Sequence, residues 1–167
     1  MEDQPAYNRR SIRLPHFDYT QPGGYFVTIC TQDRQPLFGD IQNGEMRLSL
    51  QGRAVASFME EIPLRFPNVK IETSIVMPNH AHLLFIIQGI DSGKAHEQAP
   101  TLGQIIGFFK YQTTKQINQT TATPGQRIWQ RGYYEHIIRD ERDYIAIWEY
   151  IQNNPLTWVS GEENLNP

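Results

Sequence analysis

Residues 69–88 read VKIETSIVMPNHAHLLFIIQ, and this stretch decides the fold. Both halves are rich in β-branched and apolar residues, which favour extended strands. We expect one strand over 69–76 and another over 82–88, joined at Met77-Pro78-Asn79, where proline and asparagine favour a turn. The continuous apolar run Leu83–Ile87 is typical of a buried central strand.

The flanking segments add further strands and helices around this pair. We expect strands over 25–31, 45–50 and 133–138, the second following an Asn43-Gly44 turn as part of a hairpin-like pair. Apolar residues at helical spacing predict helices over 53–66, 102–118 and from Asp140 to about Asn153, with Pro67 and Pro155 ending the first and third. Because this order has too few strand–helix–strand units for a doubly wound parallel sheet, we predict an α+β sandwich with a largely antiparallel sheet.

The composition indicates one folded domain in an aqueous compartment. The 167 residues carry 15 basic and 18 acidic side chains, a net charge of −3 that excludes a globally basic DNA-coating protein. No apolar run approaches the ~20 residues of a membrane span, and the acidic start MEDQP argues against a secretory signal. The single cysteine excludes an internal disulfide. We expect a soluble, cytoplasmic single domain over 1–167, with a basic arm at 8–18 and a short tail at 159–167.

His80 and His82 form the first candidate site. Side chains two residues apart on an extended backbone leave the same face, so both imidazoles can reach one ion. Neutral imidazole is a common ligand of divalent metals. Two unrelated histidines near a strand end, one of them capping a turn, explain the same spacing, and this alternative stays open.

Tyr150 and Asn154 form the second candidate, because positions four apart share one helix face. The stripe that we expect to be buried on this helix consists of Tyr144, Ile147, Trp148 and Ile151, with Tyr150 on its shoulder. A half-buried structural tyrosine and an asparagine that caps the end of the helix are the simpler interpretations.

The segment from Thr101 to Arg139 carries five cations and a single acid, Glu135. Aromatic residues are interleaved with the cations. Cations contact phosphates and aromatic rings stack on bases, which is what binding of a single-stranded nucleic acid needs. We predict nucleic-acid contacts from Lys110, Lys115, Arg127, Trp129, Arg131 and Arg139. The alternative is a solvated helix face without a ligand.

Several motifs together resemble one protein family. VMPNHAHLL at 76–84 resembles the two-histidine metal motif of single-tyrosine HUH transposases. Four further stretches are similar to the subgroup called REP-associated tyrosine transposases: RRSIR at 9–13, YFVTICT at 25–31, WQRGYYEH at 129–136 and YIQNNP at 150–155. The similarity runs in the same order over about residues 8–158. It implies an RRM-like or ferredoxin-like fold with a central antiparallel sheet.

The resemblance also implies roles for the candidate residues. His80 and His82 match the paired metal ligands, Asn154 matches a polar third ligand, and Tyr150 matches the nucleophile. The implied cofactor is Mg²⁺ or Mn²⁺. Tyr133, Tyr134 and Tyr144 compete with Tyr150 on sequence alone, and the resemblance at YIQNNP, together with the phase of Tyr150 relative to Asn154, favours Tyr150.

The implied activity is cleavage of single-stranded DNA near hairpin-forming palindromes, through a 5′-phosphotyrosine intermediate, as in DNA transposition. The basic arm residues Arg9, Arg10 and Arg13 are expected to clamp the DNA. Both a monomer and a homodimer are compatible with the resemblance. Two alternatives stay open: a non-catalytic single-stranded nucleic-acid-binding module of RRM-like fold, and a metal-dependent phosphodiesterase that uses water.

Overall fold

The computed structural model describes residues 22–89 and 99–158, so the predicted arm at 8–18 and tail at 159–167 lie outside the described residues. Its elements, in chain order, are β1 (Gly23–Cys30), the short 3-10 helix η1 (Gln32–Arg34), β2 (Gly39–Gln42), β3 (Glu45–Leu48), α1 (Leu50–Arg65), β4 (Val69–Met77), β5 (His80–Ile87), α2 (Leu102–Thr121), β6 (Tyr134–Ile138) and α3 (Glu141–Thr157). The predicted strands and helices are confirmed, with shifts of a few residues at their ends. No helix within these two ranges has the length and apolar character to cross a membrane.

Four strands form one antiparallel sheet in the order β4-β5-β1-β6. With α1 and α2 they give a β-α-β-β-α-β arrangement whose first and third strands lie at the centre of the sheet. This is the ferredoxin-like, or RRM-like, sandwich, so the predicted α+β fold class is confirmed. The apolar run Leu83–Ile87 lies in β5, a central strand, as expected.

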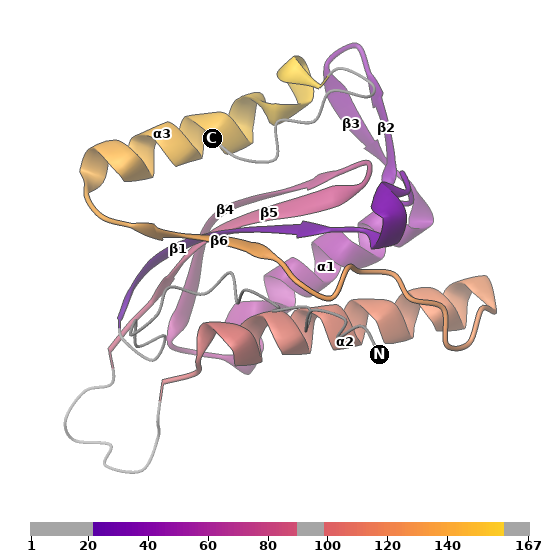
Figure 1. Cartoon of the computed structure of the whole chain (residues 1–167), viewed down its shortest axis with the longest axis horizontal. Helices are drawn as coiled ribbons and strands as arrows, with labels where there is room; N and C mark the ends of the chain where they lie inside the picture. The colour runs from indigo at the N-terminus through magenta and orange to yellow at the C-terminus, as the bar shows by residue number, and fades with distance from the viewer. Residues whose placement is uncertain (1–21, 90–98, 159–167) are drawn as a thin grey trace, which may run out of the picture.

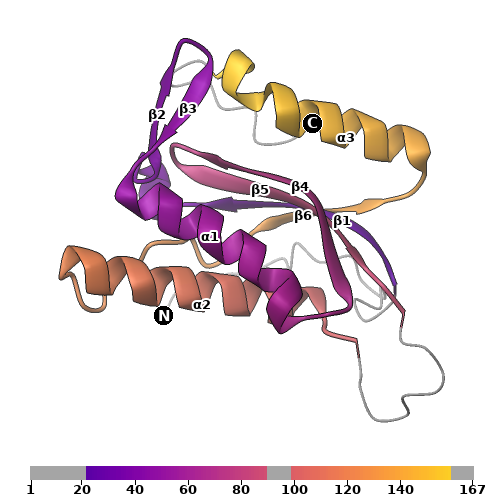
Figure 2. The ribbon, with the colours of Figure 1, turned by 180° about the vertical axis from the view of Figure 1, so that it is seen from behind.

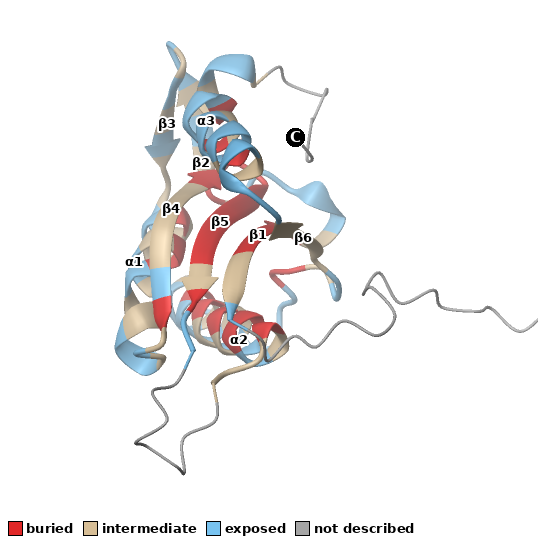
Figure 3. Cartoon of the chain, turned by 90° about the vertical axis from the view of Figure 1, so that its left-hand side faces the viewer, coloured by how far each residue is buried: buried red, intermediate tan, exposed pale blue. Residues whose placement is uncertain are grey.

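The sheet separates two packing layers, with α1 and α2 on one face and α3 on the other (Figures 1 and 2). Strand residues alternate between the faces. Tyr25 and Val27 of β1 therefore point into a large core with α1 and α2, whereas Phe26 points into a smaller core with Ile147 and Ile151 of α3. Figure 3 shows β5 buried along most of its length between the two layers.

Capping residues determine where the helices begin. Ser49 caps α1, and Thr101 forms a reciprocal capping box with Gln104 at the start of α2. Asp140 accepts a hydrogen bond of 2.9 Å from the backbone amide of Asp143 and so caps α3 where the sequence predicts the helix to begin. Each cap satisfies an amide that has no partner within its helix.

The strand expected over 45–50 is β3, and its partner is β2, which the sequence pattern does not predict. The two strands form a small separate sheet that lies beside the end of α3, where Gly44 contacts Leu156. Asn43 and Gly44 have φ angles of 54° and 76°, as a two-residue hairpin turn with left-handed central residues requires. β2 is too short, and with Gly39 and Asp40 too poor in strand-forming residues, to stand out in the sequence.

The prediction that Pro155 ends the third helix is wrong, because α3 continues through Pro155 to Thr157. A proline inside a helix removes one backbone hydrogen bond and crowds the preceding turn. Here Ile151 and Asn154 are buried against the sheet, and their packing holds the last turn in helical form.

The expected buried stripe of α3 is narrower than predicted. Ile147 and Ile151 are buried, and Tyr144 is half-buried. Trp148 is 41% exposed, so its assignment to the stripe is wrong. The fully buried part of the core under α3 consists of Phe26, Leu84, Ile147 and Ile151, and Trp148 lies outside this core.

Candidate active site

His80 and His82 are the first and third residues of β5, and both are buried, with 1% and 0% of their surface exposed. They share the face that α3 covers, because their rings contact Trp158 and Tyr150. In Figure 1 this site lies where β4 turns into β5, below the C-terminal half of α3. The pair thus lies at the end of a central strand of the sheet.

The two imidazoles meet through their Nε2 atoms, which are 3.0 Å apart. His80 Nδ1 lies 2.7 Å from Asn79 Oδ1. The Asn79 side-chain nitrogen donates to the Arg34 carbonyl, and this bond turns the amide oxygen toward His80. A neutral His80 therefore carries its proton on Nδ1 and presents a lone pair at Nε2.

His82 has a more adaptable partner, since its Nδ1 lies 2.9 Å from the Thr28 hydroxyl, which can donate or accept. With its proton on Nε2, His82 donates to His80 Nε2. With its proton on Nδ1, it donates to Thr28, and both Nε2 lone pairs then converge on one point. That second form suits one divalent cation shared by the two nitrogens, so the pair fits a metal site.

Burial keeps both histidines in the neutral form that binds metals. It lowers the pKa of His80 from 6.5 to about 4, although a hydrogen bond between His80 and Asn154 acts in the opposite direction. Burial and the neighbouring His80 lower the pKa of His82 well below 6.5. Protons therefore compete with a metal for these nitrogens only in acid solution.

We expect the stability of the fold to fall as the pH drops from 6.5 toward 4. In that range the unfolded chain binds protons at His80 and His82 that the folded chain does not, so acid favours unfolding. The shift at His80 alone corresponds to about 3 kcal/mol. Urea unfolding at a series of pH values measures this, with the double variant His80→Gln, His82→Gln as the matched comparison. The prediction is contradicted if the free energy of unfolding of the wild type falls with pH no more steeply than that of the double variant.

Tyr150 and Asn154 bring α3 into the same site. The centroid of the Tyr150 ring lies 5.3 Å from that of the His82 ring, and the Tyr150 ring packs edge-on against Phe26. Asn154 is buried, and its side chain hydrogen-bonds to both His80 and Tyr150. The predicted convergence of the phenol with the two imidazoles is thus present within one chain.

The surroundings of Tyr150 hold its hydroxyl in the protonated form. Burial raises its pKa above 10, and the hydrogen bond from Asn154 offsets part of this. Among the residues that the structure describes, no group of three His, Cys, Asp or Glu side chains is placed to hold a metal. Within this described part of the chain, Asn154 is the candidate for a third ligand, because it interacts with His80 and amide oxygens can bind cations.

Comparison with known proteins places this geometry in a family. No family model matches the chain. A Haemophilus influenzae protein described as uncharacterised is 42% identical over 166 residues, covering 91% of each chain. Another protein of the same organism, named "Putative REP-associated tyrosine transposase", is 30% identical over 147 residues, covering 83% of this chain and 73% of the relative. The chain belongs to the REP-associated tyrosine transposases.

Solved structures share the fold of this transposase. A REP-associated tyrosine transposase bound to a REP hairpin matches with a TM-score of 0.57 and 20% identity, over 89% of this chain and 76% of that one. A "putative transposase" of Deinococcus radiodurans matches with a TM-score of 0.52 and 14% identity, over 84% of this chain and 95% of that one. The family membership makes this chain an enzyme of DNA transposition.

The competing tyrosines of the transposase make other contacts than Tyr150 does. Tyr144 donates a hydrogen bond of 2.9 Å to Glu72, and Tyr133 lies under the Lys110 ammonium on the α1 and α2 side. Tyr134 packs edge-on against Phe26 on the α3 side. Among these tyrosines only Tyr150 has a ring contact with a histidine of the pair.

Lys110 is bound within the fold. Its Nζ donates to the carbonyls of Gln130, Arg131 and Gly132, at 2.9, 3.3 and 2.8 Å. An ammonium has three donors, so these contacts already use the hydrogen bonds that a phosphate would require. Burial lowers the pKa of Lys110 to about 8. The direct contact of Lys110 with DNA stays a prediction. In the structure its hydrogen bonds anchor the segment of chain that precedes β6.

The other residues predicted to contact DNA differ in how far their side chains are exposed. Lys115, Arg127, Arg131 and Arg139 are exposed, and Arg9, Arg10 and Arg13 lie outside the described residues. Trp129 is only 4% exposed, packs on Phe38 and Phe109, and donates from Nε1 to Thr113. Stacking of a base on Trp129 is therefore a wrong prediction, because its ring faces the core.

Four residues that contact the histidines were not predicted as part of the site: Phe26, Thr28, Asn79 and Trp158. Thr28 is opposite His82 in the β1–β5 register, so only the strand pairing reveals it. Asn79 lies inside the quoted histidine motif, which is the available sequence signal. The Trp158 ring centroid lies 5.9 Å from that of His80, at the end of α3.

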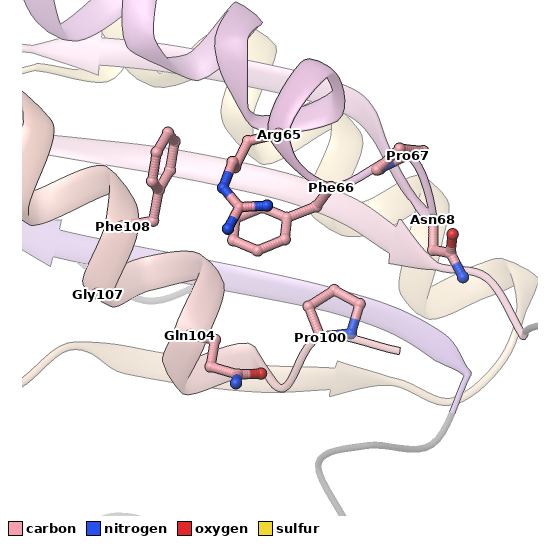
Figure 4. A pocket seen from close by; sticks show the side chains of 8 residues that line it. All are labelled: Arg65, Phe66, Pro67, Asn68, Pro100, Gln104, Gly107 and Phe108. Atoms are coloured by element: carbon pink, nitrogen blue, oxygen red, sulfur yellow. The ribbon is translucent and has the colours of Figure 1, made fainter. Parts of the chain in front are cut away.

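A hollow of about 540 Å³ opens between the end of α1 and the start of α2 (Figure 4). The rings of Phe66 and Phe108 meet there edge-on, 5.5 Å apart. Phe66 leads into Val69, which pairs with Ile87 at the end of β5 opposite to the histidines. The hollow is thus remote from the candidate active site.

Proposed function

We propose that the chain cleaves and rejoins single-stranded DNA by transesterification, with Tyr150 as the nucleophile. The observation that carries this proposal is the convergence of the Tyr150 phenol, Asn154 and the two Nε2 atoms at one end of the sheet. A module that only binds nucleic acid needs neither a buried, converging pair of imidazoles nor a phenol beside it.

In the cleavage step the Tyr150 oxygen attacks the scissile phosphorus. The new bond joins the phenol oxygen to phosphorus, and the bond from phosphorus to the 3′ oxygen breaks. The phenol loses a proton, the leaving oxygen gains one, and the products are a 5′-phosphotyrosine and a free 3′-hydroxyl. A 3′-hydroxyl that attacks the phosphotyrosine reverses the step and joins strands, so no nucleotide triphosphate is required.

The residues around Tyr150 prepare this step. Asn154 hydrogen-bonds to the phenol and orients it, and Phe26 supports the ring edge-on. Because burial raises the pKa of Tyr150, its hydroxyl is a weak nucleophile until positive charge is brought near it. The neutral histidine pair is the place where this charge can be held.

We infer that His80, His82 and Asn154 hold a divalent ion, Mg²⁺ or Mn²⁺. When bound, such an ion supplies charge that neutralises a phosphate oxygen and favours loss of the phenol proton. Thr28 and Asn79 act on the ligands, since Asn79 Oδ1 accepts the His80 proton at Nδ1 and the Thr28 hydroxyl can accept the His82 proton at Nδ1.

We further propose hairpin-forming single-stranded DNA as the substrate. The support is the family membership and the REP hairpin that is bound to the similar solved transposase. The exposed cations Lys115, Arg127, Arg131 and Arg139 are available for backbone phosphates, which would give binding that depends on salt.

A denaturing gel tests this function against its alternatives. The probe is a pool of oligonucleotides, each with one hairpin flanked by randomised single strands, labelled at either the 5′ or the 3′ end and incubated with Mn²⁺. We expect the 3′ label to move into a protein-linked band, while the 5′ label stays on a free fragment. A cleaved pool without any protein-linked label indicates a phosphodiesterase that uses water, and an uncleaved pool indicates a binding module. Either result contradicts the proposal.

A further inference from the structure

A second hollow, of about 370 Å³, lies between the C-terminal half of α2 and the chain that precedes β6. We call it the α2 groove. Its lining combines two buried apolar residues, Ile128 and Trp129, with an exposed aromatic ring and several cations. The residues concerned are Lys110, Tyr111, Thr114, Lys115, Arg127, Ile128, Trp129, Gln130 and Arg131. None of these lining residues is acidic.

Tyr111 is the unusual member of this lining, because 65% of its surface is exposed although it belongs to a helix with a well-formed apolar face. The buried face of α2 is made by other residues, such as Ile106, Phe109 and Ile117. Tyr111 therefore contributes little to the core. An exposed ring beside a hollow offers a surface on which a planar base can stack.

Three exposed cations surround the same hollow: Lys115, Arg127 and Arg131. They come from α2 and from the chain that follows it, and the turn after α2 brings the two segments together around the hollow. Lys110 fixes one of the two segments, because its ammonium binds three successive carbonyls, from Gln130 to Gly132. The wall of the groove is thus held in place before any ligand arrives.

The groove and the histidine pair lie at the same end of the sheet. The Cys30 carbonyl accepts from the Gln130 amide, and Cys30 pairs with His80 on its other side. Thr31 likewise bridges to Trp129 and donates to the Asn79 carbonyl. At the backbone, Gln130 and His80 flank the end of β1 and are two strand spacings, or ~10 Å, apart. The groove lies on the α1 and α2 side of the sheet and the histidines on the α3 side, so a DNA strand that reaches both passes round this end of the sheet, over a few nucleotides.

We propose that the α2 groove binds an unpaired nucleotide of the DNA strand, with its base on Tyr111 and its phosphate among the three exposed cations. The proposal rests on the proposed function only in taking single-stranded DNA as the ligand. It gives the strand a second point of attachment beyond the site of cleavage. Because stacking does not read the edges of a base, this attachment is indifferent to sequence.

Binding of a fluorescent thymidine oligonucleotide of about 12 nucleotides tests the proposal. Fluorescence anisotropy is recorded with the full chain between about 50 and 200 mM salt. We expect Tyr111→Leu to weaken binding about tenfold without changing the salt dependence, since it removes stacking but no charge. We expect Arg127→Gln to lower the slope of log K against log salt by about 0.7, the value for one phosphate contact on a single strand.

Matched controls replace residues of the same type outside the groove. Trp148→Leu removes another exposed aromatic ring, and Arg53→Gln removes another exposed cation, so neither should change affinity or slope. The proposal is overturned if Tyr111→Leu binds within about twofold of the wild type, or if Arg53→Gln lowers the slope as much as Arg127→Gln. The adduct gel on the wild-type chain reports separately on cleavage. If the wild type forms the adduct and Tyr111→Leu binds normally, the groove proposal is wrong and the proposed function stands. If no adduct forms and Tyr111→Leu binds weakly, the proposed function is wrong and the groove proposal stands.

Discussion

Tyr150→Phe is expected to abolish the covalent protein–DNA adduct, with a loss of at least ~10³-fold in the rate of its formation. The substitution keeps the ring that packs on Phe26 and His82 and removes only the hydroxyl. Because that oxygen forms the new bond to phosphorus, no neighbouring group can replace it at the same position. The measurement is the yield of protein-linked 3′ label on a denaturing gel.

Tyr144→Phe is the matched control, since Tyr144 lies on the same helix and its hydroxyl binds Glu72 rather than the histidine pair. It should form the adduct at close to the wild-type rate, with a loss of about 1 kcal/mol in stability from the missing hydrogen bond. DNA affinity of Tyr150→Phe should stay within a few-fold of the wild type. An adduct that survives in Tyr150→Phe and disappears in Tyr144→Phe would move the nucleophile to Tyr144.

His80→Ala is expected to remove metal-dependent cleavage, with a loss of at least ~100-fold. It deletes one of the two converging nitrogens and leaves Asn79 without its imidazole partner. Direct binding of Mn²⁺, measured by titration calorimetry, should be lost in parallel. The affinity for DNA without metal should change little, because a neutral, buried imidazole makes no phosphate contact.

Thr28→Val tests the residue that orients a metal ligand separately from the ligand itself. It removes the hydroxyl partner of His82 Nδ1 and keeps both imidazoles, so we expect Mn²⁺ affinity to fall by about tenfold without being abolished. Cleavage by Thr28→Val should recover at high Mn²⁺, whereas cleavage by His80→Ala should not. Unchanged cleavage and unchanged Mn²⁺ binding in His80→Ala would reject the metal assignment.

The sequence predicts most of the fold because local patterns carry it. The apolar run Leu83–Ile87 marks the central strand, and the cap at Asp140 marks the start of α3. Only β3 of the β2–β3 hairpin is predicted. The four residues of β2 include glycine and aspartate and show no strand pattern. Pro155 is misjudged because the rule for proline is local, whereas the burial of Asn154 that keeps the last turn helical depends on packing against the sheet.

The site is predictable in part for the same reason. Spacing alone puts His80 and His82 on one strand face and Tyr150 and Asn154 on one helix face. It cannot show that the two faces meet, since this depends on how α3 crosses the sheet. The hydrogen bond of Thr28 depends on the register between β1 and β5, which no single segment encodes.

The predicted nucleic-acid contacts show the limit of composition. Trp129 and Tyr111 are both aromatic and both lie among cations in the sequence. The structure buries Trp129 against Phe38 and leaves Tyr111 exposed. Exposure therefore decides which ring can meet a base, and exposure follows from tertiary packing.

Mapping the attachment point of the DNA tests the central claim most directly. The adduct formed on the hairpin pool is digested with nuclease and protease, and the modified peptide is identified by mass spectrometry. The account predicts a nucleotide joined through its 5′ phosphate to Tyr150, within the peptide that also carries Asn154. A nucleotide on Tyr134 or Tyr144, or cleavage of the pool with no modified tyrosine at all, would contradict it.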